Sequence, residues 1–394
     1  LQSKKETMIH RLAIDFVPGI FRTSAAGLLT LVLLAGPARA IETEAKQAFI
    51  VDYDTGAVLL EKSADEQMHP SSMSKLMTLY VLFDHLKSGS VKLDDELPVS
   101  DKAWKMGGSK MFVPNGGKVK VEDLVRGIAI QSGNDACIVV AEGIAGSEDA
   151  FVDQMNHTAK QIGLTNSTFK NATGWPDPGH LMTARDLAIL ARHLIADFPE
   201  YYRYFSEIDF TYNGIKQGNR NPLLYKNLGA DGLKTGHTDE GGYGEVGSAK
   251  RGDRRLIVVL NGMETMKFRA EESEKLIDWG FNEYNNYALL KAGDTISDAE
   301  VWLGNAPTVP LVVPSNVVVT LPRKARRGMK VTVSYDGPIP APIAKGAPIA
   351  KLVVTAPDID PIQIPLVAGA DVGTLGFTGR ITAALEHVIW GQTK

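Results

Sequence analysis

Residues 69–83 change abruptly from a small polar run into a mostly apolar stretch without glycine or proline. The polar run contains Ser72, and the apolar stretch begins at Lys75. This pattern predicts a buried helix entered from a turn that Pro70 marks. Residues three apart on a helix share a face, and the helix N-terminus favours negative charge. The Ser72 hydroxyl and the Lys75 amine are therefore expected to meet, as an activated serine requires.

The spacing Ser-x-x-Lys does not decide the matter alone. Ser167-Thr168-Phe169-Lys170 has the same spacing, and there a polar loop is the simpler interpretation. Ser72 could equally cap the helix beside a solvated lysine. Residues elsewhere in the chain that could act together with Ser72 are needed to decide between these alternatives.

The first forty residues have the pattern of a secretory signal peptide (1–40). Basic residues precede an apolar run over residues 24–36, which is followed by Ala38-Arg39-Ala40. Such a run is short for a membrane span, so we expect export to the periplasm and a mature chain from about Ile41. An uncleaved anchor helix is the alternative, and Met8 is a candidate initiator.

Net charge, cysteine content and histidine spacing indicate which partners and cofactors are not expected. A formal net charge of -4 over 394 residues gives no reason to expect nucleic acid. The single cysteine, Cys137, lies in an apolar helix-like run and is expected to be a packed thiol. The histidines show no His-Glu-x-x-His or similar ligand spacing, so no metal or cofactor is expected.

Strand patterns at both ends of residues 41–290 enclose helical ones, which predicts an α+β domain whose terminal strands share one sheet. A hairpin is expected around Asp54-Thr55-Gly56. The expected later elements are listed by range: helices over 121–130, 136–143 and 183–195, strands over 232–236, 243–249 and 255–263, and a closing helix over 271–281.

Residues 294–377 contain short β-rich runs separated by proline and glycine, which predicts a small all-β domain without a catalytic constellation. The tail, residues 378–394, has apolar residues at helical spacing and ends near Trp390. Such a helix could lie in a membrane surface, or it could dock on its own protein. Its polar face is weakly charged, and both interpretations remain open.

Two further segments supply partners for Ser72. Ser132-Gly133-Asn134 lies between two apolar helical runs, where a turn of this kind has no evident packing reason. Lys234-Thr235-Gly236 lies on a predicted strand and is followed by His237. Ser-x-x-Lys, Ser-x-Asn and Lys-Thr-Gly in this order are typical of penicillin-recognising serine acyltransferases.

The chain resembles the low-molecular-mass penicillin-binding proteins that act as D-alanyl-D-alanine carboxypeptidases, serine peptidase family S11. Residues 132–137, 231–238 and 279–281 extend the resemblance beyond the three motifs. It implies a β-lactamase/transpeptidase-like catalytic domain, a C-terminal β-sandwich and an amphipathic membrane-associating tail. It also implies peptidoglycan stem peptides as substrate and β-lactams as covalent inhibitors. The tail is less basic than such anchors often are.

The chemistry suits these residue types. A serine hydroxyl is a poor nucleophile at neutral pH and needs a nearby base, and lysine serves only when unprotonated. Enclosing Lys75 near a second cation, Lys234, disfavours its charged form. Ser72 is expected to attack the carbonyl between two terminal D-alanines and to leave an acyl-enzyme that water cleaves.

The resemblance assigns the remaining roles. The backbone N–H groups of Ser72 and His237 form the oxyanion hole, Ser132 relays a proton to the leaving amine, and Asn134 holds the substrate backbone. Thr235 and Gly236 lie at the substrate site.

The terminal carboxylate of the substrate is expected to meet Thr235, Lys234 and Arg269. Arg269 rests on the local sequence Lys267-Phe268-Arg269 alone, and a surface arginine is its alternative.

Rival functions remain. A D,D-endopeptidase or a serine β-lactamase would share the fold and the nucleophile, but no convincing Glu-x-x-Leu-Asn follows Asn134 before Lys234. A non-catalytic wall-binding scaffold is the alternative from another class, and the intact catalytic motifs count against it.

Overall fold

The computed structural model describes residues 6–11, 41–376 and 379. The chain divides into two compact units, one over Ala40–Asn282 and the other containing Glu283 and the described residues after it, together with Glu6–Arg11 (β1). The apolar run and cleavage site of the expected signal peptide lie outside the described residues. So does the expected tail helix, apart from Gly379.

The first unit is built on one antiparallel sheet of five strands in the order β3-β2-β10-β9-β8. The strands are β2 (Gln47–Asp52), β3 (Val58–Lys62), β8 (Ala230–Thr238), β9 (Gly242–Arg251) and β10 (Arg254–Met263). The first and last strands of the unit therefore share one sheet, as the sequence predicted. β8 lies at the edge of this sheet, where its backbone is open to a ligand.

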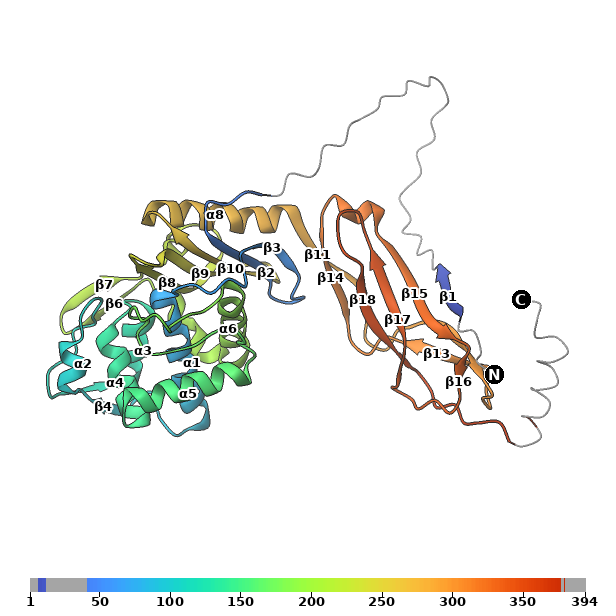
Figure 1. The fold of residues 1–394 in the computed structure, drawn as a ribbon, viewed down its shortest axis with the longest axis horizontal. Coiled ribbons are helices and arrows are strands. Elements are labelled where there is room, and N and C mark those ends of the chain that lie inside the picture. Colours follow the sequence, from blue (N-terminus) through green and yellow to red (C-terminus); the bar gives the residue numbers. More distant parts are fainter. Residues whose placement is uncertain (1–5, 12–40, 377–378, 380–394) are drawn as a thin grey trace, which may run out of the picture. The chain divides into compact units, whose positions relative to one another are not determined.

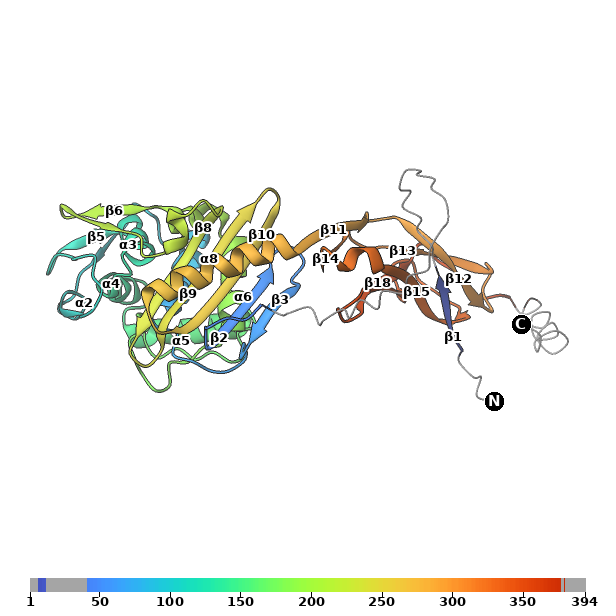
Figure 2. The same ribbon diagram turned by 90° about the horizontal axis from the view of Figure 1, so that it is seen from above.

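Helices cover both faces of this sheet (Figures 1 and 2). One face carries α8 (Met266–Glu283), which begins five residues before the predicted helix. The other face carries a cluster of α1 (Lys75–Ser88), α3 (Val121–Ala129), α4 (Asn134–Ala145), α5 (Glu148–Gln161) and α6 (Ala184–Asp197).

Shorter elements connect these helices and strands. They are the helices α2 (Asp101–Lys105) and α7 (Pro199–Tyr202), the hairpins β4 (Glu96–Pro98) with β5 (Lys118–Lys120) and β6 (Asp209–Tyr212) with β7 (Ile215–Gly218), and the 3-10 turns η1 (Ser71–Ser74), η2 (Arg203–Ser206) and η3 (Pro222–Tyr225).

Helix α1 forms the centre of the first unit. Every residue from Lys75 to Phe83 is buried, and Gly89 ends the helix in the left-handed conformation, with φ 77°. Burial of each large apolar side chain contributes about 2 kcal/mol. The helix that follows Ser72 is therefore fixed by packing on all sides, which suits a site that needs a rigid nucleophile.

The second unit is all β, as predicted. Its larger sheet has the order β1-β15-β17-β18-β13-β12-β16, and β11 pairs with β14 in a second sheet. The strands are β11 (Tyr284–Leu290), β12 (Thr295–Trp302), β13 (Thr308–Val312), β14 (Val317–Pro322), β15 (Lys330–Gly337), β16 (Ile339–Pro340), β17 (Pro348–Thr355) and β18 (Ile362–Ala368), with the 3-10 turn η4 (Ala325–Gly328).

The boundary between the units differs from the expected one. The sequence placed the end of the first domain at residue 290, but the structure divides the chain between Asn282 and Glu283. The reason is that β11 pairs along its length with β14 and so belongs to the second unit. Strand β11 follows helix α8 without an intervening loop. The composition of the sequence therefore does not change at this boundary.

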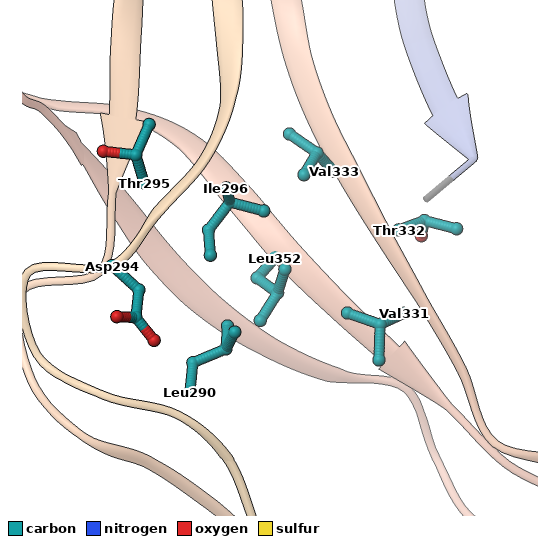
Figure 3. A pocket seen from close by; sticks show the side chains of 8 residues that line it. All are labelled: Leu290, Asp294, Thr295, Ile296, Val331, Thr332, Val333 and Leu352. Atoms are coloured by element: carbon teal, nitrogen blue, oxygen red, sulfur yellow. The ribbon is translucent and has the colours of Figure 1, made fainter. Parts of the chain in front are cut away.

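A cavity of about 240 Å³ lies in the second unit (Figure 3). Its lining is mostly aliphatic, and it comprises Leu290, Asp294, Thr295, Ile296, Val331, Thr332, Val333 and Leu352. Its polar lining residues are Asp294, Thr295 and Thr332, and no serine, cysteine, lysine or histidine lines it.

Candidate active site

Ser72 and Lys75 meet as their spacing predicted. Lys75 Nζ donates to Ser72 Oγ at 2.7 Å. Ser72 itself lies on the 3-10 turn η1, directly before α1, and is partly exposed, whereas Lys75 is completely buried. The hydroxyl thus faces a cleft while its partner amine is shielded from water.

A loop from another part of the chain holds this pair from behind. Lys75 Nζ also makes a short hydrogen bond to the carbonyl oxygen of Thr173. The next residue, Gly174, has φ +74°, and a Cβ atom there would lie 2.0 Å from the carbonyl oxygen of Ser71. Only glycine permits this approach, so the loop fixes both η1 and the lysine amine.

Burial favours the neutral form of Lys75, which is the form that can act as a base. Loss of hydration lowers the pKa of Lys75 to about 8, and the charge of Arg220 adds to this effect. Lys234 is also buried, and its pKa is lowered well below its ordinary value by burial first and by the charge of Lys75 second. Burial, which the sequence argument named together with the nearby Lys234, is thus the main cause of the lowered pKa of Lys75.

Ser132 and Asn134 lie on the turn between α3 and α4. Ser132 has φ 60°, which is rare for a residue with a side chain, and its buried Oγ has no hydrogen-bond partner among the described residues. Asn134 is the first residue of α4, and its Nδ2 donates to the carbonyl oxygen of Gly107 at 2.8 Å. A strained residue with an unused hydroxyl is typical of a functional site.

Asp135 explains how this turn is held, and sequence reasoning missed it. Its two carboxylate oxygens accept from the backbone N–H groups of Met111, Phe112 and Val113 at 2.9–3.2 Å. This buried carboxylate fixes the loop whose Gly107 carbonyl receives Asn134. The available signal was an aspartate in the first turn of a buried helix, where a charge needs partners.

The edge strand β8 carries the third motif alongside η1. Lys234 Nζ donates to the carbonyl oxygen of Thr235 at 2.9 Å, and both residues are buried. A Cβ atom on Gly236 would lie 2.9 Å from the carbonyl oxygen of Pro70, so the glycine permits close packing on η1. Thr238 Oγ1 lies 3.0 Å from Ser71 Oγ and joins the end of β8 to the same turn.

The remaining expected residues are His237, near the end of β8, and Arg269, on α8. His237 is exposed, and its ring stacks on that of Tyr243 with centroids 3.9 Å apart. Arg269 lies in the first turn of α8 and is 4% exposed, so it is a buried residue and not a surface arginine. Its charge lowers the pKa of Lys234, which places it within electrostatic reach of the motif.

A cleft of about 320 Å³ joins several of these groups. Ser72, Asn134 and His237 all line it, and Trp175 and Glu240 contribute further walls. Trp175 was not singled out from the sequence, because only the tertiary fold brings its loop to Ser72. The indole is 47% exposed and offers an apolar surface beside the nucleophile.

The described residues contain no cluster of three or more His, Cys, Asp or Glu side chains suited to a metal ion. Cys137 is buried and burial raises its pKa to about 12, in keeping with the packed thiol predicted from the sequence. In the part of the chain that the structure describes, no helix is both long and apolar enough to span a membrane.

A serine bonded to a buried lysine, a Ser-Gly-Asn turn and a Lys-Thr-Gly edge strand together define a serine acyltransferase site of the penicillin-recognising class. Comparison with known families agrees. The model of the D-alanyl-D-alanine carboxypeptidase family, peptidase S11, matches residues 35–265, and that of the C-terminal domain of penicillin-binding protein 5 matches residues 284–374. The chain belongs to the S11 family of D-alanyl-D-alanine carboxypeptidases.

Curated relatives cover nearly the whole chain. The D-alanyl-D-alanine carboxypeptidase DacC of Escherichia coli K12 is 40% identical over 92% of this chain and 94% of its own length. DacA of the same organism is 38% identical over 86% of each. The family, the fold class and the enzyme class expected from the sequence are thereby confirmed.

Solved structures show the same architecture. Penicillin-binding protein 5 of Haemophilus influenzae matches with a TM-score of 0.78 and 38% identity, covering 84% of this chain and 98% of that one. Penicillin-binding protein D2 of Listeria monocytogenes in its ampicillin-bound form matches with a TM-score of 0.55 and 30% identity, covering 61% and 99%.

Proposed function

We propose that this protein removes the terminal D-alanine from peptidoglycan stem pentapeptides through an acyl-enzyme on Ser72. The observation that carries the proposal is the 2.7 Å hydrogen bond between Ser72 Oγ and the fully buried amine of Lys75. A buried amine that can lose its proton near neutral pH supplies the base that a serine nucleophile needs.

The reaction proceeds in two halves. Lys75 takes the proton of Ser72 as Oγ bonds to the carbonyl carbon between the two D-alanines. The resulting oxyanion lies between the backbone N–H groups of Ser72 and His237, where one donor is typically worth about 10² to 10³ in rate. Ser132 passes a proton to the departing nitrogen, the C–N bond breaks, and water then hydrolyses the ester.

The other residues orient the substrate. Asn134 holds its backbone, and the edge strand at Gly236 receives it alongside. Thr235, Lys234 and Arg269 receive the terminal carboxylate, whose negative charge suits the buried guanidinium of Arg269 and favours the protonated form of Lys234. The unused hydroxyl of Ser132 and its position beside Asn134 support the proton relay.

The same geometry accounts for β-lactams as covalent inhibitors. A β-lactam presents an amide carbonyl to Ser72 and a carboxylate to the Thr235 side of the cleft. The ampicillin-bound Listeria relative shows that proteins of this fold bind such compounds. We infer a long-lived acyl-enzyme, because no glutamate in a Glu-x-x-Leu-Asn context follows Asn134 to assist rapid hydrolysis.

The activity is tested by offering the enzyme two substrates that differ beyond the scissile bond. Incubation with a stem pentapeptide is expected to yield a tetrapeptide and free D-alanine, identified by mass spectrometry. A cross-linked muropeptide in a parallel reaction is expected to react much more slowly. Cleavage of the cross-link without release of D-alanine from the pentapeptide would instead establish an endopeptidase.

We also infer export and peripheral membrane contact. The signal-like residues 1–40 support delivery to the periplasm, and the one-sided apolar pattern of residues 378–394 supports a helix lying in the inner-membrane surface.

Removal of residues 379–394 is expected to shift the protein from the membrane fraction to the soluble fraction, because the apolar face of the tail is lost. Fractionation followed by penicillin labelling measures both location and folding of the catalytic unit. A truncated protein that partitions like the full chain would favour a tail docked on its own protein.

A further inference from the structure

Glu245 is a fully buried carboxyl group that the proposed reaction does not use. It lies in the middle of β9 with no exposed surface, directly opposite Thr235 on β8. Opposite residues of an antiparallel pair project from the same face of the sheet. The side chain of Glu245 therefore projects from the same face of the sheet as that of Thr235, the residue expected to receive the substrate carboxylate.

Helix α8 packs over this face with Arg269 and Ser273 one turn apart. Ser273 Oγ donates to Glu245 Oε2 at 2.7 Å, and the guanidinium of Arg269 lies 5.9 Å from the centre of the Tyr243 ring. Tyr243 precedes Glu245 by two residues and shares its face of the sheet. Arg269 and Glu245 are thus neighbours along one packed interface and lie within electrostatic reach of each other.

Both groups have unused hydrogen-bonding capacity. Glu245 Oε1 and Arg269 Nε are buried without a hydrogen-bond partner among the described residues. The guanidinium makes one long contact, from Nη2 to the carbonyl oxygen of Arg220 at 3.4 Å. Burying half-satisfied charged groups is costly, and an apolar residue at position 245 would pack without that cost. Such an arrangement favours a functional reason for the carboxyl.

We propose that Glu245 is a positioning residue that controls how much of the positive charge of Arg269 is offered to the substrate carboxylate. When Glu245 is neutral, the guanidinium is free to bind the substrate. When Glu245 is ionised, it attracts Arg269 and competes with the substrate for that charge. The proposal rests on the proposed function in one respect, that Thr235 and Arg269 receive the terminal carboxylate.

The control is expected to act in the neutral pH range. Burial raises the pKa of Glu245 to about 7, and the nearby charge of Arg269 and the hydrogen bond from Ser273 oppose this rise. Raising the pH through 7 therefore ionises Glu245 and weakens carboxylate binding, whereas below pH 6 binding reaches a plateau.

Few other charged groups face this carboxyl. On α8 the neighbouring Glu272 instead bonds Thr43 and Lys275. Leu260 is opposite on β10, and Lys234 projects from the other face of β8 because neighbouring strand residues alternate. The titratable groups on its face are Arg269 on α8, Tyr243 on its own strand and His237 on β8, which is opposite Tyr243, with Arg220 beyond Arg269.

The test compares pH profiles of the full-length protein with those of Glu245→Gln and Glu245→Leu. Benzylpenicillin and a stem pentapeptide serve as ligands because both carry a carboxylate, and Glu272→Gln is the matched control for loss of a buried carboxyl near α8. Two quantities are measured: the KM for the pentapeptide, and the penicillin concentration that gives half the maximal acylation rate. In the wild type and the control, both should rise about three- to tenfold from pH 6 to 8.5. Both Glu245 variants should lose the part of this rise that is centred near pH 7, and their kcat at any one pH should be close to that of the wild type.

Three outcomes would overturn the proposal: profiles of both Glu245 variants that match the wild type, a wild-type KM that falls as pH rises, or flattening in Glu272→Gln as well. Use of leucine as well as glutamine guards against a single variant that folds poorly. The penicillin profile does not require D-alanine release, so failure of the proposed carboxypeptidase activity would leave this test intact.

Discussion

Replacement of Ser72 by alanine is expected to abolish covalent labelling by benzylpenicillin and to reduce D-alanine release by roughly 10⁴-fold or more. The methyl group cannot form the acyl-enzyme, and Lys75 is then left without the hydroxyl to which it donates at 2.7 Å. Labelled penicillin followed by denaturing electrophoresis measures the first effect, and a pentapeptide assay measures the second.

Ser167→Ala provides a matched control, because Ser167 and Lys170 repeat the Ser-x-x-Lys spacing. In the structure Ser167 Oγ donates to Asp186 Oδ2 at 2.7 Å, so this serine is held in a structural hydrogen bond. Labelling should survive this change. Labelling that persists in Ser72→Ala would show that the acylated residue lies elsewhere.

The contrast between these two serines shows what the sequence could predict. Local patterns placed Ser72 before a buried helix, Ser132 on a turn between helices and Lys234 on a strand, and the structure has each in that setting. Ser72 was then distinguished from Ser167 because the Ser-Gly-Asn and Lys-Thr-Gly motifs follow it in the order typical of the family. These features depend on residues close in sequence, where periodicity and turn chemistry are informative.

The features that sequence reasoning missed depend on contacts between distant segments. The carbonyl of Thr173 reaches Lys75 across 98 positions, and Asp135 fixes a loop more than twenty residues away. Glu245 lies in the run Gly-Glu-Val-Gly, which lacks a clear alternation of polar and apolar residues. Its burial is visible only when α8 is placed over β9.

The position of Arg269 was also beyond what local patterns could predict, because the sequence did not distinguish a surface arginine from one in the site. Its helix begins at Met266, five residues before the predicted start, because the apolar pattern becomes regular only further along. With the earlier start, Arg269 lies in the first turn and faces the sheet. A helix boundary thus decided whether a charged residue was interpreted as solvated or as part of the site.

Lys75→Met is expected to lower the rate of penicillin acylation by about 10² to 10⁴, the usual contribution of a positioned general base. Methionine resembles the lysine stem in shape but cannot accept a proton. In the wild type the acylation rate should rise with pH and level off above about pH 8, because only the neutral amine is a base and burial lowers its pKa to about 8. Stopped-flow acylation from pH 6 to 10 measures both effects, with Lys170→Met as the spacing-matched control. A normal acylation rate in Lys75→Met would assign the base elsewhere.

The same substitution should stabilise the folded protein near neutral pH. The folded-state pKa of Lys75 is about 8 and its ordinary value is 10.5, so the unfolded chain binds more protons between these values. The cost of burying this charge, ~3 kcal/mol, is therefore fully present below pH 8 and disappears as the pH rises through 10.5. Lost hydrogen bonds to Ser72 and Thr173 offset part of the gain, at about 1 kcal/mol each. Thermal unfolding at pH 7 should thus show a midpoint a few degrees higher for Lys75→Met. The gain should vanish at about pH 9, where the remaining cost of the buried charge equals the loss of the two hydrogen bonds, and above that pH the variant should be the less stable protein. A variant that is both inactive and more stable would show that the buried amine is retained for catalysis at the expense of stability.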